Sequence, residues 1–354
     1  MTMKQRCLML GAGGMARVWI RDIWPLYHDR AEITALVDVN RQVLDESGDF
    51  LGLPASARFD DVKEAFARSE ADFCCIVTPP LFHHEAIELA CARKMDILCE
   101  KPLADSWEAC KAIYRAVQKS GVRLMVTQNY RYNATILTLK KAVAELGQIN
   151  YIVAHWSEDY RVRDSSGAFR HCMKHPLLVE YAVHHLDQIR NLTNSDCHFV
   201  SGFAWNPGQE RAFKGSESYD GAPCGLWNLQ MSNGSFAHYE GSGMASGETH
   251  GWHHETYRAE CENGVATLSS GGVVCVQRRE NGTVVTREIP IEKPQREGHA
   301  ILPQQFLDWR EGGPLPPTHL GDNLQTVALM FGAMQAAETQ RVIDVQALVR
   351  EAMA

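Results

Sequence analysis

Glycines near the N-terminus stand at the spacing of a nucleotide-binding loop. The run Gly11-Ala12-Gly13-Gly14-Met15-Ala16 follows an apolar, strand-like segment and opens a helix-like one. The first glycine permits a tight turn, the second lets the backbone approach a pyrophosphate, and Ala16 lets the helix pack closely on the sheet. The residues that we expect to contact a dinucleotide here are Gly11, Gly13, Gly14, Met15 and Ala16.

An acidic residue follows the second strand-like run, residues 33–37. Asp38 lies about 22 residues after the glycine loop, at the distance where such folds place a ribose-binding carboxylate. A carboxylate there accepts hydrogen bonds from both hydroxyls of the adenosine ribose and repels a 2′-phosphate. The pattern therefore favours NAD over NADP, although the nearby Arg41 leaves the use of NADP open. The alternative interpretation of Asp38 is an exposed strand-end carboxylate.

Two later strand-like runs end in residues that are unusual at a strand end. The run 73–77 is followed by Thr78-Pro79-Pro80, and the run 97–99 is followed by Glu100-Lys101-Pro102. Open parallel sheets bind ligands outside the carboxyl ends of their strands. The residues expected to line the cofactor site for this reason are Thr78, Pro79, His83, Glu100 and Lys101.

Lys101 is the residue of this set that could carry chemistry. A lysine that is shielded from water beside a nicotinamide ring has its ammonium form disfavoured, so it can give and take protons near neutrality. The alternative is a surface lysine at a strand end.

These residues require a sheet of parallel strands to position them. The first half of the chain alternates strand-like and helix-like segments, with strand-like runs at 7–10, 33–37, 73–77, 97–99 and 123–127. Asp61-x-x-Glu64 and Asp105-x-x-Glu108 resemble helix-capping boxes, and Gly121 stands at an expected helix C-terminus. We therefore predict a doubly wound parallel sheet of the Rossmann type, covered on both faces, over residues 1–127.

The second half of the chain has a different pattern. A helical segment at 177–192 precedes strand-like runs joined by Asn233-Gly234, Asn263-Gly264 and Asn281-Gly282, each of which favours a tight hairpin. Helices are expected at 322–339 and 345–353. We predict an α+β domain over residues 128–354 with a large, open, mostly antiparallel sheet.

Composition excludes several classes of protein. The chain has 354 residues, a formal charge of −8 and no run long enough to span a membrane, so we expect no nucleic-acid and no membrane partner. Lys4 and Arg6 are followed by too short an apolar stretch for a secretory signal. The 11 cysteines are irregularly spaced and lie partly in apolar runs. Buried thiols in a reducing compartment, the cytoplasm, are the interpretation.

Taken together, the glycine loop, Thr78-Pro79-Pro80, Glu100-Lys101-Pro102 and the helix in the 180s resemble the Gfo/Idh/MocA family of glucose–fructose oxidoreductase and inositol dehydrogenase. The resemblance covers nearly the whole chain, including Asn129-Tyr130-Arg131-Tyr132, and adds Asn129 to the expected cofactor contacts. It implies C-terminal helices that return toward the N-terminal domain. It also implies a substrate pocket on one face of the second sheet and an oligomer contact on the other, hence a homodimer or homotetramer.

The family's substrate helix usually reads Asp-x-x-x-His-x-x-Asp, and the matching residues here are Glu180, His184 and Asp187. Their spacing places all three on one face of a helix. By periodicity alone that face is a solvated one, whereas the resemblance turns it toward the nicotinamide. Glu180 replaces the commoner Asp, which leaves the substrate's identity open. His185 points about 100° away from His184 and is interpreted as structural.

The resemblance implies a dehydrogenase that transfers a hydride between NAD(P) and a hydroxyl or keto group of a sugar, sugar derivative or cyclic polyol such as an inositol. His184 would act as general base, Lys101 would stabilise the developing charge on the substrate oxygen, and Glu180 would hold the substrate. The expected substrate contacts are Lys101, Arg131, Trp156, Tyr160, Arg163, Glu180, His184 and Tyr239.

Two alternatives and one exclusion complete these expectations. An NAD-dependent enzyme that cleaves glycosides by transient oxidation and elimination would use the same residues, and a non-catalytic sensor of NAD(H) or sugars could share the fold. The histidine-rich runs His171-Cys172-x-x-His175 and His250-x-x-His253-His254 lack the paired spacing of a structural zinc site, so no metal is expected.

Overall fold

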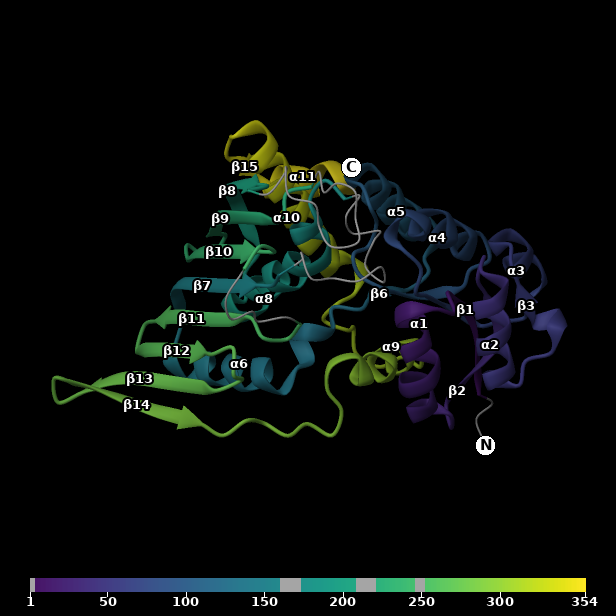
Figure 1. Cartoon of the computed structure of the whole chain (residues 1–354), viewed down its shortest axis with the longest axis horizontal. Helices are drawn as coiled ribbons and strands as arrows, with labels where there is room; N and C mark the ends of the chain where they lie inside the picture. The colour runs from purple at the N-terminus through teal and green to yellow at the C-terminus, as the bar shows by residue number, and fades with distance from the viewer. Residues whose placement is uncertain (1–3, 160–172, 208–220, 246–251) are drawn as a thin grey trace. The chain divides into compact units, whose positions relative to one another are not determined.

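The computed structural model describes residues 4–159, 173–207, 221–245 and 252–354 (Figure 1). The chain forms two compact units: residues 1–129, 296–324 and 351–354 make up the first, and residues 130–295 and 325–350 the second. The sequence placed the boundary between 127 and 128 and assigned everything after it to one domain. The structure differs in giving residues 128–129, 296–324 and 351–354 to the first unit.

The first unit is built on a six-stranded parallel sheet with the strand order β3-β2-β1-β4-β5-β6. Its strands are β1 (Gln5–Leu10), β2 (Ala31–Val37), β3 (Arg58–Phe59), β4 (Phe73–Ile76), β5 (Asp96–Cys99) and β6 (Leu124–Val126). Every strand except the short β3 carries a run of buried residues, as a sheet covered on both faces requires. The predicted doubly wound parallel sheet is confirmed, and only the two-residue β3 had no signal in the sequence.

Helical segments connect these strands. They are α1 (Gly14–Val18), η1 (Trp19–Ile23), η2 (Trp24–Tyr27), α2 (Arg41–Leu51), η3 (Ala55–Ala57), α3 (Val62–Arg68), η4 (Pro80–Phe82), α4 (His83–Ala92) and α5 (Trp107–Ser120), followed late in the chain by η9 (Gly298–Ile301) and α9 (Leu302–Arg310).

Two of the predicted helix ends are confirmed and one is wrong. The Asp61 side chain caps α3 by accepting a hydrogen bond from the backbone N–H of Glu64 at 2.7 Å. Gly121 ends α5 in the left-handed conformation, with φ at +74°. The cap of α5 is not Asp105, however, because the Ser106 side chain accepts the N–H of Ala109 instead.

The second unit contains a nine-stranded sheet with the order β14-β13-β12-β11-β7-β10-β9-β8-β15. Its strands are β7 (Ile149–Ser157), β8 (Cys197–Trp205), β9 (Cys224–Met231), β10 (Phe236–Ser242), β11 (Thr256–Cys261), β12 (Gly264–Leu268), β13 (Val274–Glu280), β14 (Thr283–Ile289) and β15 (Ile343–Asp344). The pair β10–β7 is parallel and the other pairs are antiparallel, which confirms the predicted mostly antiparallel sheet.

The three Asn-Gly pairs lie at the three hairpins β9–β10, β11–β12 and β13–β14, as predicted. At the last of these, Asn281 and Gly282 both have positive φ, at 50° and 82°, between the paired residues Glu280 and Thr283. A two-residue turn with two positive φ angles matches the right-handed twist of the strands, which is why Asn-Gly is favoured there.

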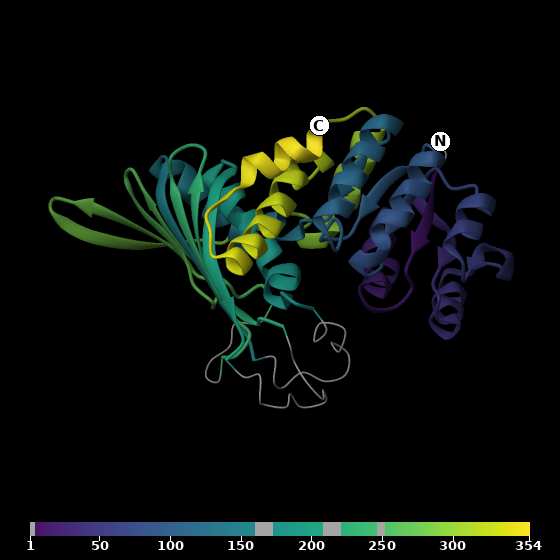
Figure 2. The same cartoon turned by 90° about the horizontal axis from the view of Figure 1, so that it is seen from above.

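Helices cover one face of this sheet (Figure 2). The helical segments assigned mainly to the second unit are η5 (Asn129–Tyr132), α6 (Ala134–Leu146), η8 (Leu177–Ala182), α8 (Val183–Thr193), α10 (Leu320–Thr339) and α11 (Val345–Met353). In β7, residues alternate between the buried, helix-covered face and the opposite face. That opposite face exposes large side chains: Tyr151, Phe203, Trp205 and Phe236.

Within the described ranges, all ten cysteines are unpaired thiols and nine of them are buried, as the interpretation of buried thiols expects. Of the helices in this part of the chain, none has the length and apolar character to cross a membrane.

Candidate active site

The glycine loop of the first unit has the backbone geometry that its sequence predicts. Gly11 has φ at +99°, and a Cβ atom at this position would lie 2.3 Å from the carbonyl oxygen of Val77. Only glycine fits there, because the loop passes directly against the end of β4. Gly13 then precedes α1 in an extended conformation, and Gly14 has φ at +47°. The N–H groups at the start of α1 are thus left to a ligand.

Asp38 follows β2 as expected and is bonded to the glycine loop itself. Its Oδ2 accepts the backbone N–H of Ala12 at 2.8 Å, while Oδ1 accepts the N–H of Asn40 at 2.8 Å. Each carboxylate oxygen has a second lone pair for a ribose hydroxyl. Asp38 therefore joins the glycine loop to the end of β2. The structure shows this bond to the loop, which the sequence spacing alone does not reveal.

Buried polar atoms of the first unit also fit a dinucleotide. Two buried oxygen atoms have no hydrogen-bond partner among the described residues. They are Thr78 Oγ1, which lies just after β4, and Asn129 Oδ1, which lies in η5. Buried polar atoms are nearly always satisfied, so such atoms are explained by a polar ligand. Together with the loop that a Cβ would block, these atoms meet the requirements for a dinucleotide site.

His83, one of the predicted cofactor contacts, is engaged by the protein itself, and its contact with a cofactor stays a prediction. Its side chain is fully buried in the first unit, and its ring nitrogens lie 2.8 Å from the carbonyl oxygen of Thr78 and 3.1 Å from that of Pro102. Burial lowers the pKa of this imidazole, although the neighbouring carbonyls oppose the shift. Because both nitrogens are already engaged by the protein, we assign His83 a positioning role: it ties the segment after β4 to the segment after β5.

Glu100, at the end of β5, is held as a carboxylate. Its Oε1 accepts the indole N–H of Trp19 at 2.8 Å and lies 3.4 Å from His299 Nε2. Burial opposes ionisation, but the hydrogen bond and charge of His299 and the bond from Trp19 outweigh it and lower the pKa to about 2. Oε2 accepts the backbone N–H of Lys101 at 3.1 Å. Glu100 therefore fixes the backbone from which Lys101 extends.

In the second unit, His184 stands on a helix that is buried on all sides. Glu180, His184 and Asp187 are 5%, 2% and 0% exposed, so the solvated face that periodicity alone favours is wrong. The predicted single helix is also modified, because Leu177–Ala182 forms a π-helical segment, η8, before α8 begins. Glu180 therefore lies in a wider turn than His184, and π segments occur frequently at functional sites.

Aromatic rings surround His184. The ring of Tyr130 stacks on it, with centroids 4.1 Å apart and planes at 12°. The ring of His253 in turn lies 4.4 Å from the ring of Tyr130. The indole of Trp252 meets His184 edge-on at 6.4 Å. Stacked rings hold the imidazole in one orientation, which is what a general base requires.

The partner of Asp187 is an arginine of the protein, Arg131. Its two carboxylate oxygens accept a pair of hydrogen bonds from Arg131, both at 2.7 Å, and Thr326 donates to Oδ1 at 2.6 Å. Burial opposes ionisation of this carboxyl, but the charges of Arg131 and Arg190 outweigh it and lower the pKa. Arg131 thus serves first to fix α8, and its expected contact with substrate stays a prediction.

Two other expected substrate contacts belong to the packing between the helix and the sheet. Trp156 is fully buried and stacks on Tyr181 at 4.1 Å. Tyr239 is fully buried as well, and its hydroxyl lies 2.9 Å from His185 Nδ1. Large aromatics on the inner face of a strand fill the core, so the structure gives both residues a packing role. Tyr160 and Arg163 lie outside the described residues.

The histidine-rich runs contribute no metal site in the described ranges. No group of three or more His, Cys, Asp or Glu side chains converges there, and His175 instead lies 2.8 Å from Glu338. His171, Cys172 and His250 lie outside the described residues.

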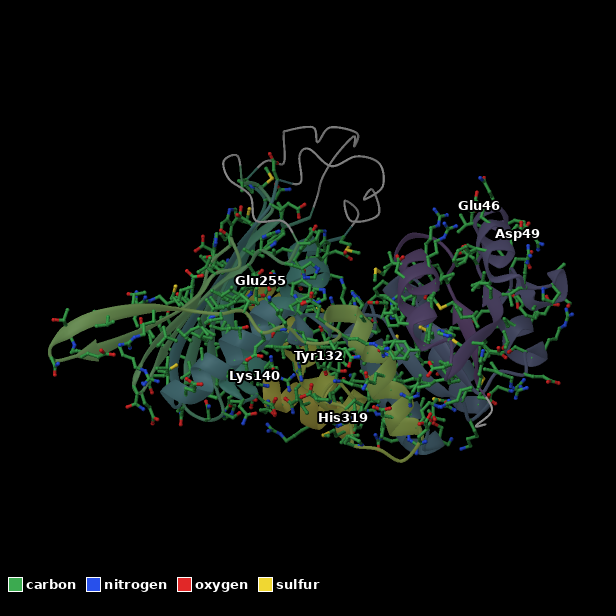
Figure 3. All side chains as sticks on the ribbon, turned by 90° about the horizontal axis from the view of Figure 1, so that it is seen from below. Glu46, Asp49, Tyr132, Lys140, Glu255 and His319 are labelled. Carbon is green, nitrogen blue, oxygen red and sulfur yellow. The ribbon has the colours of Figure 1, made fainter. Side chains whose placement is uncertain are left out.

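Sequence reasoning missed Glu255, which lies just before β11 and is labelled in Figure 3. Its side chain is 3% exposed, and Oε2 has no hydrogen-bond partner among the residues that the structure describes. Burial raises the pKa of this carboxyl to about 7. The signal was present in strand alternation, because Glu255, Tyr257 and Ala259 share the face that the helices cover.

Residues 5–128 match the model of an oxidoreductase family with an NAD-binding Rossmann fold, Gfo/Idh/MocA. The chain is also 33% identical to the protein y4oX of Sinorhizobium fredii, over 97% of its own length and 96% of the relative's. The chain belongs to the Gfo/Idh/MocA family. Another relative, the D-apiose dehydrogenase of Rhizobium rhizogenes, is 25% identical over 90% of this chain and 92% of its own.

Solved structures of the same fold agree along almost the full length. An oxidoreductase from Agrobacterium radiobacter in complex with NAD+, L-tartaric acid and magnesium has a TM-score of 0.82 at 22% identity, covering 98% of this chain and all of that one. Levoglucosan dehydrogenase in complex with NADH and levoglucosan also has a TM-score of 0.82, at 19% identity, covering 97% and 100%. At these identities the likeness establishes the fold. The cofactor class and the fold class predicted from the sequence are confirmed.

Proposed function

We propose that this protein is a dehydrogenase that uses NAD to oxidise a secondary hydroxyl of a sugar, sugar derivative or cyclic polyol, or that reduces the corresponding ketone. The observation that carries the proposal is His184, a histidine that Tyr130 holds by stacking on a buried helix, with a buried acid, Glu180, four residues before it. The relatives named D-apiose dehydrogenase and inositol 2-dehydrogenase support the substrate class.

The residues of the first unit would hold the cofactor. The glycine loop and the start of α1 would bind the pyrophosphate, and Asp38 would bind the adenosine ribose and exclude a 2′-phosphate. When bound, NAD supplies the acceptor for the hydride that leaves the carbinol carbon. Asp38 is the reason to propose NAD rather than NADP as the preferred form.

The proposed reaction at the substrate hydroxyl uses a base, a hydrogen-bond donor and a residue that binds substrate. His184 would take its proton as general base, and Lys101 would donate a hydrogen bond to the same oxygen and stabilise its developing negative charge. Glu180 would accept a hydrogen bond from a neighbouring hydroxyl. Glu100, which fixes the Lys101 backbone, and Asp187, which fixes α8 through Arg131, would position these groups.

The exposed face of the second sheet supports a proposal about assembly. Tyr151 of β7 and Phe236 of β10 are register partners and are 42% and 51% exposed. Large apolar side chains in adjacent strands are typical of a subunit interface. We propose that this face joins copies of the chain into a homodimer or homotetramer. In light scattering, Phe236→Glu should reduce the oligomer to a smaller species, and an unchanged mass would contradict the proposal.

The test of the activity is a panel of sugars, inositols and sugar acids, each with NAD and with NADP, followed at the NADH absorbance band. The proposal expects NADH with at least one cyclic polyol or sugar. No NADH with any member, together with tightly retained NAD and cleavage of a glycoside, would favour the transient-oxidation mechanism instead. No NADH and no cleavage would leave a sensor of NAD(H) or sugars.

A further inference from the structure

A polar cluster lies on the helix-covered face of the second sheet, behind the helix that carries His184. Strand register places Tyr239 of β10 and Tyr257 of β11 on either side of Ala154 of β7. Glu255 precedes Tyr257 by two residues and so projects from the same face. All three polar side chains are almost completely buried, and Glu255 Oε2 and the Tyr257 hydroxyl have no partner among the described residues.

His185 of α8 contacts this cluster. Its Nδ1 lies 2.9 Å from the Tyr239 hydroxyl, and its Nε2 lies 4.0 Å from Glu255 Oε2. Burial lowers the pKa of His185 to about 3, so the ring is neutral. The Tyr239 hydroxyl and Nδ1 share a hydrogen bond, and Nε2 faces Glu255 Oε2 at a separation longer than a hydrogen bond. His185 is therefore a polar link between the sheet and α8, rather than only a packing residue.

The cluster is connected to His184 through Tyr130. The Tyr130 ring stacks on His184 at 4.1 Å and meets the ring of His185 at 6.2 Å. Its hydroxyl accepts the backbone N–H of His253 at 3.3 Å, two residues before Glu255. The charge of Glu255 also acts on Tyr130, since it raises the pKa of that phenol after burial itself. Tyr130 therefore contacts both His184 and the segment that carries Glu255, and the charge of Glu255 acts on it.

The part of the chain that the structure describes places other charged and titratable groups around this cluster. Within 4 Å of Glu255, the described residues offer no lysine or arginine, only the neutral His185. Asp187 acts on Tyr257 but is paired with Arg131 and Arg190. The remaining groups that face His185, Tyr130 or Tyr257 are His155, His253, Glu158, Tyr181 and Tyr239.

We propose that Glu255 is a positioning residue for the proton transfer at His184: it lies beside the neutral His185 and supplies the buried negative charge that favours protonated His184. The inference rests on the proposed function, because it assumes that His184 accepts the substrate's proton. The coupling is reciprocal, so a proton on His184 favours ionised Glu255. Because the carboxyl ionises near neutral pH, this charge develops in the range where a histidine base works.

The test compares Glu255→Gln with the wild-type protein and with Glu260→Gln. Glutamine keeps the size of the side chain and removes its charge. Glu260 is on the same strand but ion-paired with Arg258 at the surface, so its substitution is a matched control. The first readout is the pKa of the His184 ring in the free protein, from NMR titration with the resonance assigned by His184→Asn.

We expect Glu255→Gln to lower the pKa of His184 by about one unit, which is the effect of losing one nearby opposite charge, while Glu260→Gln leaves it unchanged. The acidic limb of the pH profile of kcat/KM should move by the same amount, and Glu255→Asp, which keeps the charge, should restore both. An unshifted His184 titration in a folded Glu255→Gln protein would overturn the proposal. So would a Glu255→Gln chain that fails to fold, since that outcome assigns Glu255 to stability alone.

The two readouts separate this inference from the proposed function. If no polyol or sugar is oxidised, the proposed activity fails, but the NMR titration of His184 still reports whether Glu255 acts on it. If turnover is found and the titration does not shift, the activity stands and the role of Glu255 is withdrawn.

Discussion

The two units each contain a buried glutamate close to a residue of the proposed reaction, and the two ionise in opposite ways. Glu100 is 6% exposed and has a pKa of about 2, whereas Glu255 is 3% exposed and has a pKa of about 7. Burial alone would raise the pKa of both carboxyl groups. The difference comes from donors: Glu100 receives hydrogen bonds from Trp19 and the Lys101 backbone and faces His299, while Glu255 Oε2 receives none from the described residues.

This comparison shows that the protein uses burial for two purposes. Donors around Glu100 make a permanent anion, which holds the backbone before Lys101 in one conformation. Glu255 Oε2 has no donor in the described ranges, and the charge of this carboxyl therefore depends on pH and on its neighbours. The first arrangement suits a rigid cofactor site, and the second suits a site where a proton is exchanged.

The largest effects are expected at the two residues that the glutamates support. Lys101→Ala and His184→Ala should each lower turnover by on the order of 10² to 10⁴, because one removes the donor to the substrate oxygen and the other removes the base. Steady-state kinetics on the best substrate of the panel measures the loss, and fluorescence titration with NADH should show that the cofactor still binds.

Matched surface variants provide the controls for this pair. Lys119→Ala lies on the exposed side of α5, and His238→Ala lies near Asn228 on β10. Both control variants, Lys119→Ala on α5 and His238→Ala on β10, should keep wild-type turnover. Wild-type kcat in Lys101→Ala or His184→Ala would remove that residue from the mechanism.

Glu100→Gln should destabilise the protein at neutral pH. The lowered pKa means that the charged form contributes stability above the unfolded value of 4.5, and this stability is lost as pH falls through about 2. A shift of about 2.5 units corresponds to roughly 3 kcal/mol. Urea unfolding at pH 7 measures the free energy of unfolding, and Glu108→Gln on the surface of α5 is the control. An unchanged midpoint would contradict the assigned ionisation of Glu100.

Glu255→Gln should have the opposite sign, and only at high pH. The raised pKa means that the protonated form is favoured by folding, so stability is fully present below 4.5 and is lost as pH rises through about 7. Removing the carboxyl should therefore raise the free energy of unfolding at pH 9 by up to roughly 3 kcal/mol and change it little at pH 4. If Glu255→Gln instead destabilises the protein at both pH values, the two glutamates do not differ as described.

The sequence was a good guide where function and fold use the same residues. Gly11 can be recognised in the sequence because only glycine fits against Val77. The Asn-Gly pairs indicate hairpins because Asn281 and Gly282 adopt positive φ angles. These are local requirements of the backbone, and they can be recognised from neighbouring residues alone. The parallel first sheet and the mostly antiparallel second sheet followed from such signals.

Sequence reasoning failed where a residue's role depends on distant partners. His83 lies close to a strand end, but its ring nitrogens contact backbone carbonyl oxygens 5 and 19 residues away in the sequence. Glu255 follows two histidines in an apparently polar segment, so its alternation with Tyr257 and Ala259 indicates a buried side chain only once the pairing of β11 with β7 places that face. The π-helical turn at η8 had no signal, because hydrophobic periodicity cannot distinguish it from an α-helix over six residues.

Asp38 provides a third carboxylate, and its substitution should have the smallest effect. It is bonded to the Ala12 and Asn40 N–H groups, so it combines a fixing role like that of Glu100 with a charge directed at a ligand. Asp38→Asn keeps an oxygen for the Ala12 N–H and removes the charge, whereas Asp38→Ala removes both. The two variants therefore separate repulsion of a 2′-phosphate from anchoring of the glycine loop.

If repulsion sets the preference for NAD, Asp38→Asn should shift the ratio of kcat/KM for NADP over NAD by about tenfold, equivalent to roughly 1.4 kcal/mol. Asp38→Ala should shift the ratio similarly but also weaken the binding of both cofactors, because the Ala12 N–H loses its acceptor. Direct titration with NADH and NADPH checks the binding without turnover. A ratio that changes in Asp38→Ala but not in Asp38→Asn would mean that loop geometry, and not charge, distinguishes the two cofactors.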